Sequence, residues 1–146
     1  MDEKRRNFFA SIVQQSKQIS ECRNPKAALI VRGEGNFGIG FNKPIFPGKI
    51  EKTGESREYK ETYPIFDAIR GRILRSYLDD GGQEVRGSGK AGSIAFLTYF
   101  PHVEELKLLY QENIRKIYFF GDIDDENSVN FMNDLTYDDA FIGDKV

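Results

Sequence analysis

The sequence predicts an α/β fold of three layers, α-β-α, in which a mixed central sheet carries helices on both faces. Short apolar runs typical of buried strands alternate along the chain with longer segments of helical periodicity. A glycine-containing turn joins the first two strands, which favours an antiparallel hairpin. Helical segments separate the later strands, so these are expected to be parallel neighbours.

The first half of the chain is predicted to form a helix, a hairpin and a second helix. Residues 5–20 have helical spacing, and these side chains share the apolar face: Phe8, Phe9, Ile12, Val13 and Ile19. The run AALIV at 27–31 predicts a strand buried on both faces, and FGIGF at 37–41 predicts its partner. A long polar loop at 43–62 precedes the second helix at 63–80, where Pro64 suits the first turn.

The second half is predicted to contain two strand–helix units. The strands are SIAFLTYF at 93–100 and KIYFFGD at 116–122, and the helices are 101–114 and a short one at 127–135. Asn127 or Ser128 is expected to cap the last helix. The glycine-rich segment at 81–92 lacks the spacing of a phosphate-binding loop, and a linker is the favoured interpretation.

Composition limits the class of protein. The chain has 146 residues, which suits a single domain over 1–146, and its net charge of −2 gives no strong nucleic-acid signal. One cysteine, Cys22, cannot form an intrachain disulfide or a multi-cysteine zinc site. No stretch is apolar enough to span a membrane, so a cytoplasmic location is expected. The acidic segment 122–146 is interpreted as solvated surface, and the alternative is a tail that repels nucleic acid or docks on a basic partner.

Several short words of sequence, taken in order, resemble the deoxycytidylate deaminase family within the cytidine deaminase-like fold. They are SECRNPKAALIVR at 20–32, GFNKP at 40–44 and AFLTYFPHVEELKLLYQENIRKIYFF at 95–120. The resemblance extends from about Phe8 to Leu135. Each word is weak alone, and their order and spacing carry the resemblance.

The chemistry of that family requires two motifs, His-Ala-Glu and Pro-Cys-x-x-Cys. The histidine and the two thiolates hold Zn²⁺, the metal activates a water, and the glutamate moves protons. The resemblance puts Tyr63 at the histidine position and Ile65 at the glutamate position. It puts His102 and Glu105 at the two cysteine positions.

These replacements predict a protein without the family's catalysis. Tyr63 is a poor zinc ligand, Ile65 cannot move a proton, and a catalytic zinc needs three protein ligands. We therefore expect no catalytic residue, no zinc or other cofactor, and a metal pocket filled by apolar side chains. The favoured function is that of an inactive deaminase-like pseudoenzyme that binds a nucleotide or a protein.

Two alternatives remain open at this point. A divergent zinc-dependent nucleotide deaminase would rebuild its metal site from His102, Glu105 and a third group. A scaffold or regulatory subunit would act within a deaminase-like oligomer. Since active relatives form oligomers, the resemblance implies a homo-oligomer or a pairing with a deaminase-like partner.

Three residues are candidates for nucleotide binding. The resemblance implies that Asn42 contacts the sugar, although an asparagine at a strand end also satisfies its own backbone. It places Thr98 beside the pocket, where β-propensity is the simpler explanation. Tyr63 offers a ring for base stacking, although such rings more often fill a core. Arg57 in the long loop could meet a phosphate, with a solvated loop as the favoured interpretation.

Overall fold

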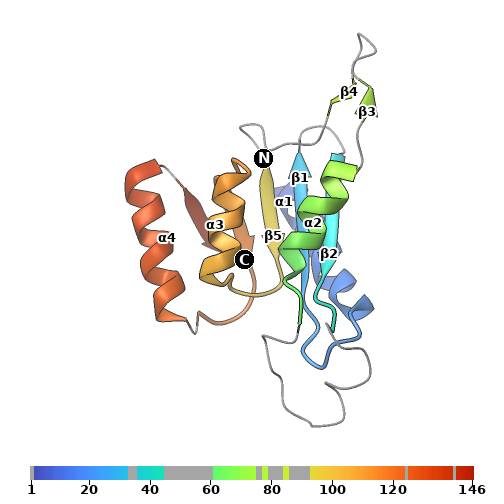
Figure 1. The fold of residues 1–146 in the computed structure, drawn as a ribbon, viewed down its shortest axis with the longest axis horizontal. Helices are drawn as coiled ribbons and strands as arrows, with labels where there is room; N and C mark the ends of the chain where they lie inside the picture. The colour runs from blue at the N-terminus through green and yellow to red at the C-terminus, as the bar shows by residue number, and fades with distance from the viewer. Residues whose placement is uncertain are drawn as a thin grey trace.

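The computed structural model describes residues 2–32, 36–44, 61–74, 77–78, 84–85, 93–123, 125–139 and 141–146. Most of the predicted loop at 43–62, including Arg57, lies outside the described residues, as does most of the glycine-rich segment at 81–92. The described elements form an α/β arrangement around one main sheet (Figure 1).

The main sheet contains five strands in the order β2-β1-β5-β6-β7. Their bounds are β1 Ala27–Arg32, β2 Asn36–Phe41, β5 Ile94–Leu97, β6 Lys116–Phe119 and β7 Ile142–Lys145. β1 pairs antiparallel with β2 and with β5, whereas β5–β6 and β6–β7 are parallel. The predicted hairpin, the parallel neighbours and the mixed sheet are thereby confirmed.

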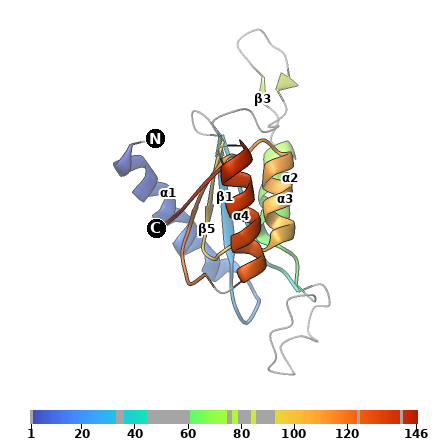
Figure 2. The same cartoon turned by 90° about the vertical axis from the view of Figure 1, so that its left-hand side faces the viewer.

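Helices cover both faces of this sheet, so the three predicted layers are confirmed (Figure 2). Helix α1 (Glu3–Ser16) lies on one face, and the other face carries α2 (Pro64–Leu74), α3 (Val103–Gln111) and α4 (Glu126–Asp139). β1 alternates between two cores because successive side chains of a strand point to opposite faces. Leu29 belongs to the core under α1, and Ile30 belongs to the core under α2, α3 and α4.

The apolar face predicted for the first helix is only partly buried. Phe9 and Val13 pack into the core, but Phe8 is 60% exposed and Ile19 is 68% exposed. Phe8 precedes Phe9 by one residue and therefore lies about 100° around the helix from it. Ile19 falls in a short 3₁₀ segment, Lys17–Ile19, after the α-helix has ended.

Several predicted boundaries were wrong. The helix predicted at 63–80 begins at Pro64 but ends at Leu74, and Tyr77–Leu78 form β3, which pairs with β4 (Glu84–Val85). The strand predicted at 93–100 ends at Leu97. The last helix extends to Asp139, and its cap is Asp125 rather than Asn127 or Ser128, because Asp125 Oδ1 accepts a hydrogen bond from the Ser128 N–H at 3.2 Å.

The edge strand β7 was not predicted at all. Its sequence, IGDK, has no apolar alternation, and three of its four residues are exposed. Pairing with the neighbouring β6 produces the strand, and its own sequence gives no local signal for one.

A glycine allows α2 to pack directly against β2. A Cβ atom added to Gly40 would lie 2.2 Å from the Pro64 carbonyl oxygen and 2.4 Å from the Ala68 nitrogen. Both neighbours are backbone atoms, so the helix itself would have to move. Since α2 borders the site described below, Gly40 helps to set the position of that site.

We predict that Gly40→Ala lowers the free energy of unfolding by about 1–3 kcal/mol, because the extra methyl overpacks this contact. Urea denaturation followed by circular dichroism measures the change. Gly143→Ala is the matched control, because its added Cβ would meet the Met132 side chain, which can rotate away. Equal losses in the two variants would contradict this packing argument.

Candidate ligand-binding cleft

A cleft of about 880 Å³ lies where β5 and β6 end and where α2, α3 and α4 begin. Ligand sites in α/β sheets commonly lie at such an edge. The described residues that line it are Asn24, Lys26, Asn42, Glu61, Thr62, Tyr63, Pro64, Thr98, Tyr99, Phe100, His102, Glu105, Gly121, Asp122, Asp125, Glu126 and Asn127. Most of these side chains are polar.

The structure brings five predicted site residues together in this cleft: Asn42, Tyr63, Thr98, His102 and Glu105. Ile65, the sixth, does not line it and is fully buried in the core. The expectation of an apolar-filled pocket was therefore wrong for this cleft. Ile65 points into the core, which leaves the neighbouring space open and polar.

The carboxylate of Glu105 is buried beneath the cleft and bound on both oxygens. Glu105 is 1% exposed; its Oε2 accepts a hydrogen bond from the Tyr99 hydroxyl, and its Oε1 accepts one from the His102 backbone N–H at 3.3 Å. Burial, followed by the charge and the hydrogen bond of Glu105, holds the pKa of Tyr99 well above its usual value. Tyr99 therefore stays protonated and remains a donor.

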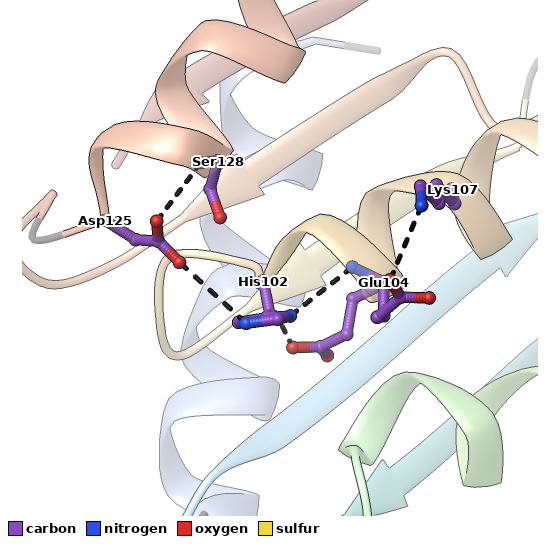
Figure 3. A network of polar contacts seen from close by, with 6 residues as sticks. His102, Glu104, Lys107, Asp125 and Ser128 are labelled. Carbon is purple, nitrogen blue, oxygen red and sulfur yellow. Dashed lines mark hydrogen bonds and ion pairs between the residues drawn. The ribbon is translucent and has the colours of Figure 1, made fainter.

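His102 joins three segments at the rim. It caps α3 through Nδ1, which accepts from the Glu104 backbone N–H at 3.4 Å (Figure 3). In the neutral ring this puts the proton on Nε2, which lies 4.0 Å from Asp125 Oδ2 at the start of α4 (Figure 3). The ring also stacks on that of Tyr63, with centroids 5.7 Å apart and an interplanar angle of 20°.

Asp125 holds the start of the last helix at the same rim. The hydrogen bond from the Ser128 backbone N–H, together with a smaller effect of His102, lowers the pKa of the Asp125 carboxyl. The carboxylate is therefore ionised near neutral pH and sits on the positive end of α4. Together with His102, it links the starts of α3 and α4.

The donors in the cleft do not fit a catalytic zinc ion. Such a site needs three protein ligands and one open position. Among the described residues, no three His, Cys, Asp or Glu side chains are grouped so that they could hold a metal. Glu105 already binds Tyr99, and Cys22 is buried outside the cleft lining.

Asn42 is fully engaged by the protein. Its Oδ1 accepts from Ser20 Oγ at 2.6 Å and from the Lys26 N–H at 2.8 Å. Its Nδ2 donates to the Asn24 carbonyl at 2.8 Å and to Glu61 Oε2 at 3.0 Å. A side-chain amide has two acceptor and two donor positions, and all four are used here. This favours the structural interpretation of Asn42 over a sugar contact.

Thr98 is likewise engaged in local structure. Its hydroxyl accepts from the Ala27 N–H at 2.9 Å and donates to the Ala27 carbonyl at 3.3 Å. These bonds continue the pairing of β1 with β5 beyond the end of the strand. Thr98 borders the cleft, but its hydroxyl forms hydrogen bonds with the backbone of Ala27 in β1.

The most informative cleft residue that the sequence did not single out is Glu61. It is only 9% exposed, and its Oε2 binds Asn42. Its other oxygen, Oε1, is buried without a hydrogen-bond partner in the described part of the chain. Glu61 belongs to a polar loop with no periodic pattern, so only the fold reveals its burial.

Comparisons with known proteins support the fold. No family model matches the chain, and no curated protein matches it either. The chain is similar to a solved structure of dCMP deaminase from the cyanophage S-TIM5, determined in complex with dCMP and dUMP. The two share 16% sequence identity and superpose with a TM-score of 0.74, and the match covers 100% of this chain and 99% of the phage enzyme. The apo form of the same enzyme matches at 15% identity and a TM-score of 0.70, with full coverage of both chains.

The chain thus has the cytidine deaminase-like α/β fold that the resemblance predicted. Identities of this size establish the fold alone. Within the described residues, no helix is both long and apolar enough to cross a membrane.

We predict that Tyr99→Phe lowers the free energy of unfolding by about 1–3 kcal/mol, because the buried Glu105 carboxylate loses a donor. Urea denaturation at neutral pH measures the loss. Tyr137→Phe is the control, since Tyr137 is 91% exposed and should be neutral.

The same variant should also change the dependence of stability on pH. The pKa of Tyr99 is raised in the folded state, so its contribution is complete below the unfolded pKa of about 10 and is lost as pH rises beyond it. Wild-type protein should therefore lose stability more steeply above about pH 10 than Tyr99→Phe. Parallel curves would show that folding does not raise the pKa of Tyr99.

We predict that Asn42→Ala lowers the free energy of unfolding by roughly 2–4 kcal/mol, since four hydrogen bonds around a buried amide are lost together. Thermal and urea unfolding measure the loss. Asn130→Ala, at an exposed position of α4, is the matched control and should cost nothing. A stable Asn42→Ala variant would argue against the structural role of this residue.

Proposed function

We propose that this chain is a catalytically inactive protein of deaminase-like fold that binds a nucleoside or nucleotide in its cleft. The observation that carries the proposal is an open cleft in which the residues at the family's zinc-ligand and proton-transfer positions contact other protein groups. Glu105 binds Tyr99, His102 caps α3 and stacks on Tyr63, and Ile65 lies in the core.

The size and shape of the cleft support binding of a small molecule. Its volume of about 880 Å³ falls within the usual range for small-molecule sites, roughly 300–1,000 Å³. Tyr63, Tyr99 and Phe100 place aromatic rings along it, and every nucleobase has a face that can pack on such a ring. The similar phage enzyme was solved with dCMP and dUMP, which makes nucleosides and nucleotides the first ligands to test.

Absence of hydrolysis is proposed from the chemistry of the side chains. Hydrolytic deamination of this kind needs an activated water and a group that moves protons to the base. Ile65 has no ionisable group that could transfer a proton, and the raised pKa of Tyr99 keeps the Tyr99 hydroxyl protonated. The described cleft therefore supports recognition better than turnover. Oligomerisation, alone or with a deaminase-like partner, and a cytoplasmic location remain predictions.

The proposal is tested by titrating the purified protein with deoxycytidine, dCMP and dUMP in a calorimeter, with thermal shift as a second readout. Saturable binding of at least one ligand is expected, with stabilisation of about 2.7 kcal/mol at a hundredfold excess over Kd. Zinc content measured on the same sample should be far below one ion per chain. Incubation with dCMP should yield no dUMP.

Two variants locate the binding. Tyr63→Ala should weaken it, whereas Phe8→Ala, which removes an exposed ring outside the cleft, should not. Stoichiometric zinc that is lost in His102→Ala, together with dUMP formation, would overturn the proposal in favour of a divergent deaminase. Failure of all three ligands to bind would overturn the proposed ligand class.

A further inference from the structure

The described lining of the cleft is strongly acidic. Five of its side chains are carboxylates: Glu61, Glu105, Asp122, Asp125 and Glu126. Among the described lining residues, Lys26 is the one lysine or arginine, and its Nζ lies 5.3 Å from the ring centroid of Tyr99. A phosphate entering this space would meet mostly like charge.

The starts of α3 and α4, two of the three helices that begin at the cleft, are also poorly suited to a phosphate. An uncapped helix N-terminus binds anions through its free backbone N–H groups and its dipole. Here α3 is capped by His102 and carries Glu104 and Glu105 in its first turn, and α4 is capped by Asp125 and begins with Glu126. The protein's own carboxylates already occupy the positive ends of these helices.

A separate observation concerns Glu61, which lacks a hydrogen-bond donor that a ligand could provide. Glu61 is nine-tenths buried, and its Oε1 has no hydrogen-bond partner among the residues that the structure describes. A buried carboxylate oxygen without a donor is costly. An N–H or O–H group of a ligand held in the cleft would supply that donor.

From these features we infer that the cleft selects a neutral, donor-bearing nucleoside and rejects the corresponding nucleoside phosphate. This inference rests on the proposed function and specifies its ligand class. Glu61 is the anchor for a ligand donor, and the remaining carboxylates exclude a phosphate by repulsion. The aromatic side chains contribute packing that does not depend on charge.

The test compares deoxycytidine with dCMP, which differ only by the phosphate, by calorimetry at about 0.05 M and about 0.5 M salt. Deoxycytidine should bind at least about tenfold more tightly at low salt. The difference should shrink at high salt, because ions screen the repulsion of the phosphate.

Charge-removing variants separate repulsion from poor fit. The double variant Asp122→Asn/Glu126→Gln should tighten dCMP binding relative to deoxycytidine binding, so that the ratio of the two affinities moves toward one. Asp134→Asn/Glu3→Gln makes the same change in net charge outside the cleft lining and should alter neither. Glu61→Gln should weaken deoxycytidine by about tenfold, as expected for a lost hydrogen bond to a charged group.

The outcomes distinguish this inference from the proposed function. If dCMP binds as tightly as deoxycytidine or more tightly, the inference is overturned and the proposed function stands. If neither binds and dUMP also fails, the proposed function is overturned and the inference with it. If deoxycytidine binds equally well to Glu61→Gln, the role of Glu61 as anchor is overturned.

Discussion

The hydrogen bond between the Tyr99 hydroxyl and the buried Glu105 carboxylate is the interaction on which the rest of the cleft depends. A buried carboxylate is tolerated only when it is well paired, since an unpaired charge in this environment is strongly destabilising. Tyr99 follows β5, and Glu105 lies in the first turn of α3, so the bond fixes the turn between sheet and helix. With that turn fixed, His102 reaches both Tyr63 and the rim at Asp125.

Contacts between side chains provide the links between the helices around the cleft. Tyr63, just before α2, stacks on His102 at the start of α3, and His102 approaches Asp125 at the start of α4. Asn42 and Glu61 join the end of β2 to the segment that leads into α2. These links hold the walls of the cleft in place without an apolar filling. Among the described residues that line the cleft, Glu61 Oε1 is left as a buried acceptor without a hydrogen bond.

Local sequence patterns predicted most of the fold because the strands and helices of the core are strongly periodic. AALIV forms the interior strand β1, and the helix after His102 buries Leu106 and Leu109. β7 was not predicted because its residues are mostly exposed and their extended conformation depends on pairing with β6. The resemblance predicted that Asn42, Tyr63, His102 and Glu105 lie at one site. It did not predict their hydrogen bonds, because these depend on tertiary contacts. Glu61 gave no signal, because its burial exists only in the folded chain.

The central claim is that the cleft recognises its ligand without metal chemistry, and calorimetry before and after exhaustive metal chelation tests it most directly. The account predicts the same deoxycytidine affinity in both samples, and no formation of deoxyuridine when zinc is added back. Binding that disappears on chelation and returns with zinc, or turnover that begins when zinc is restored, would contradict the account.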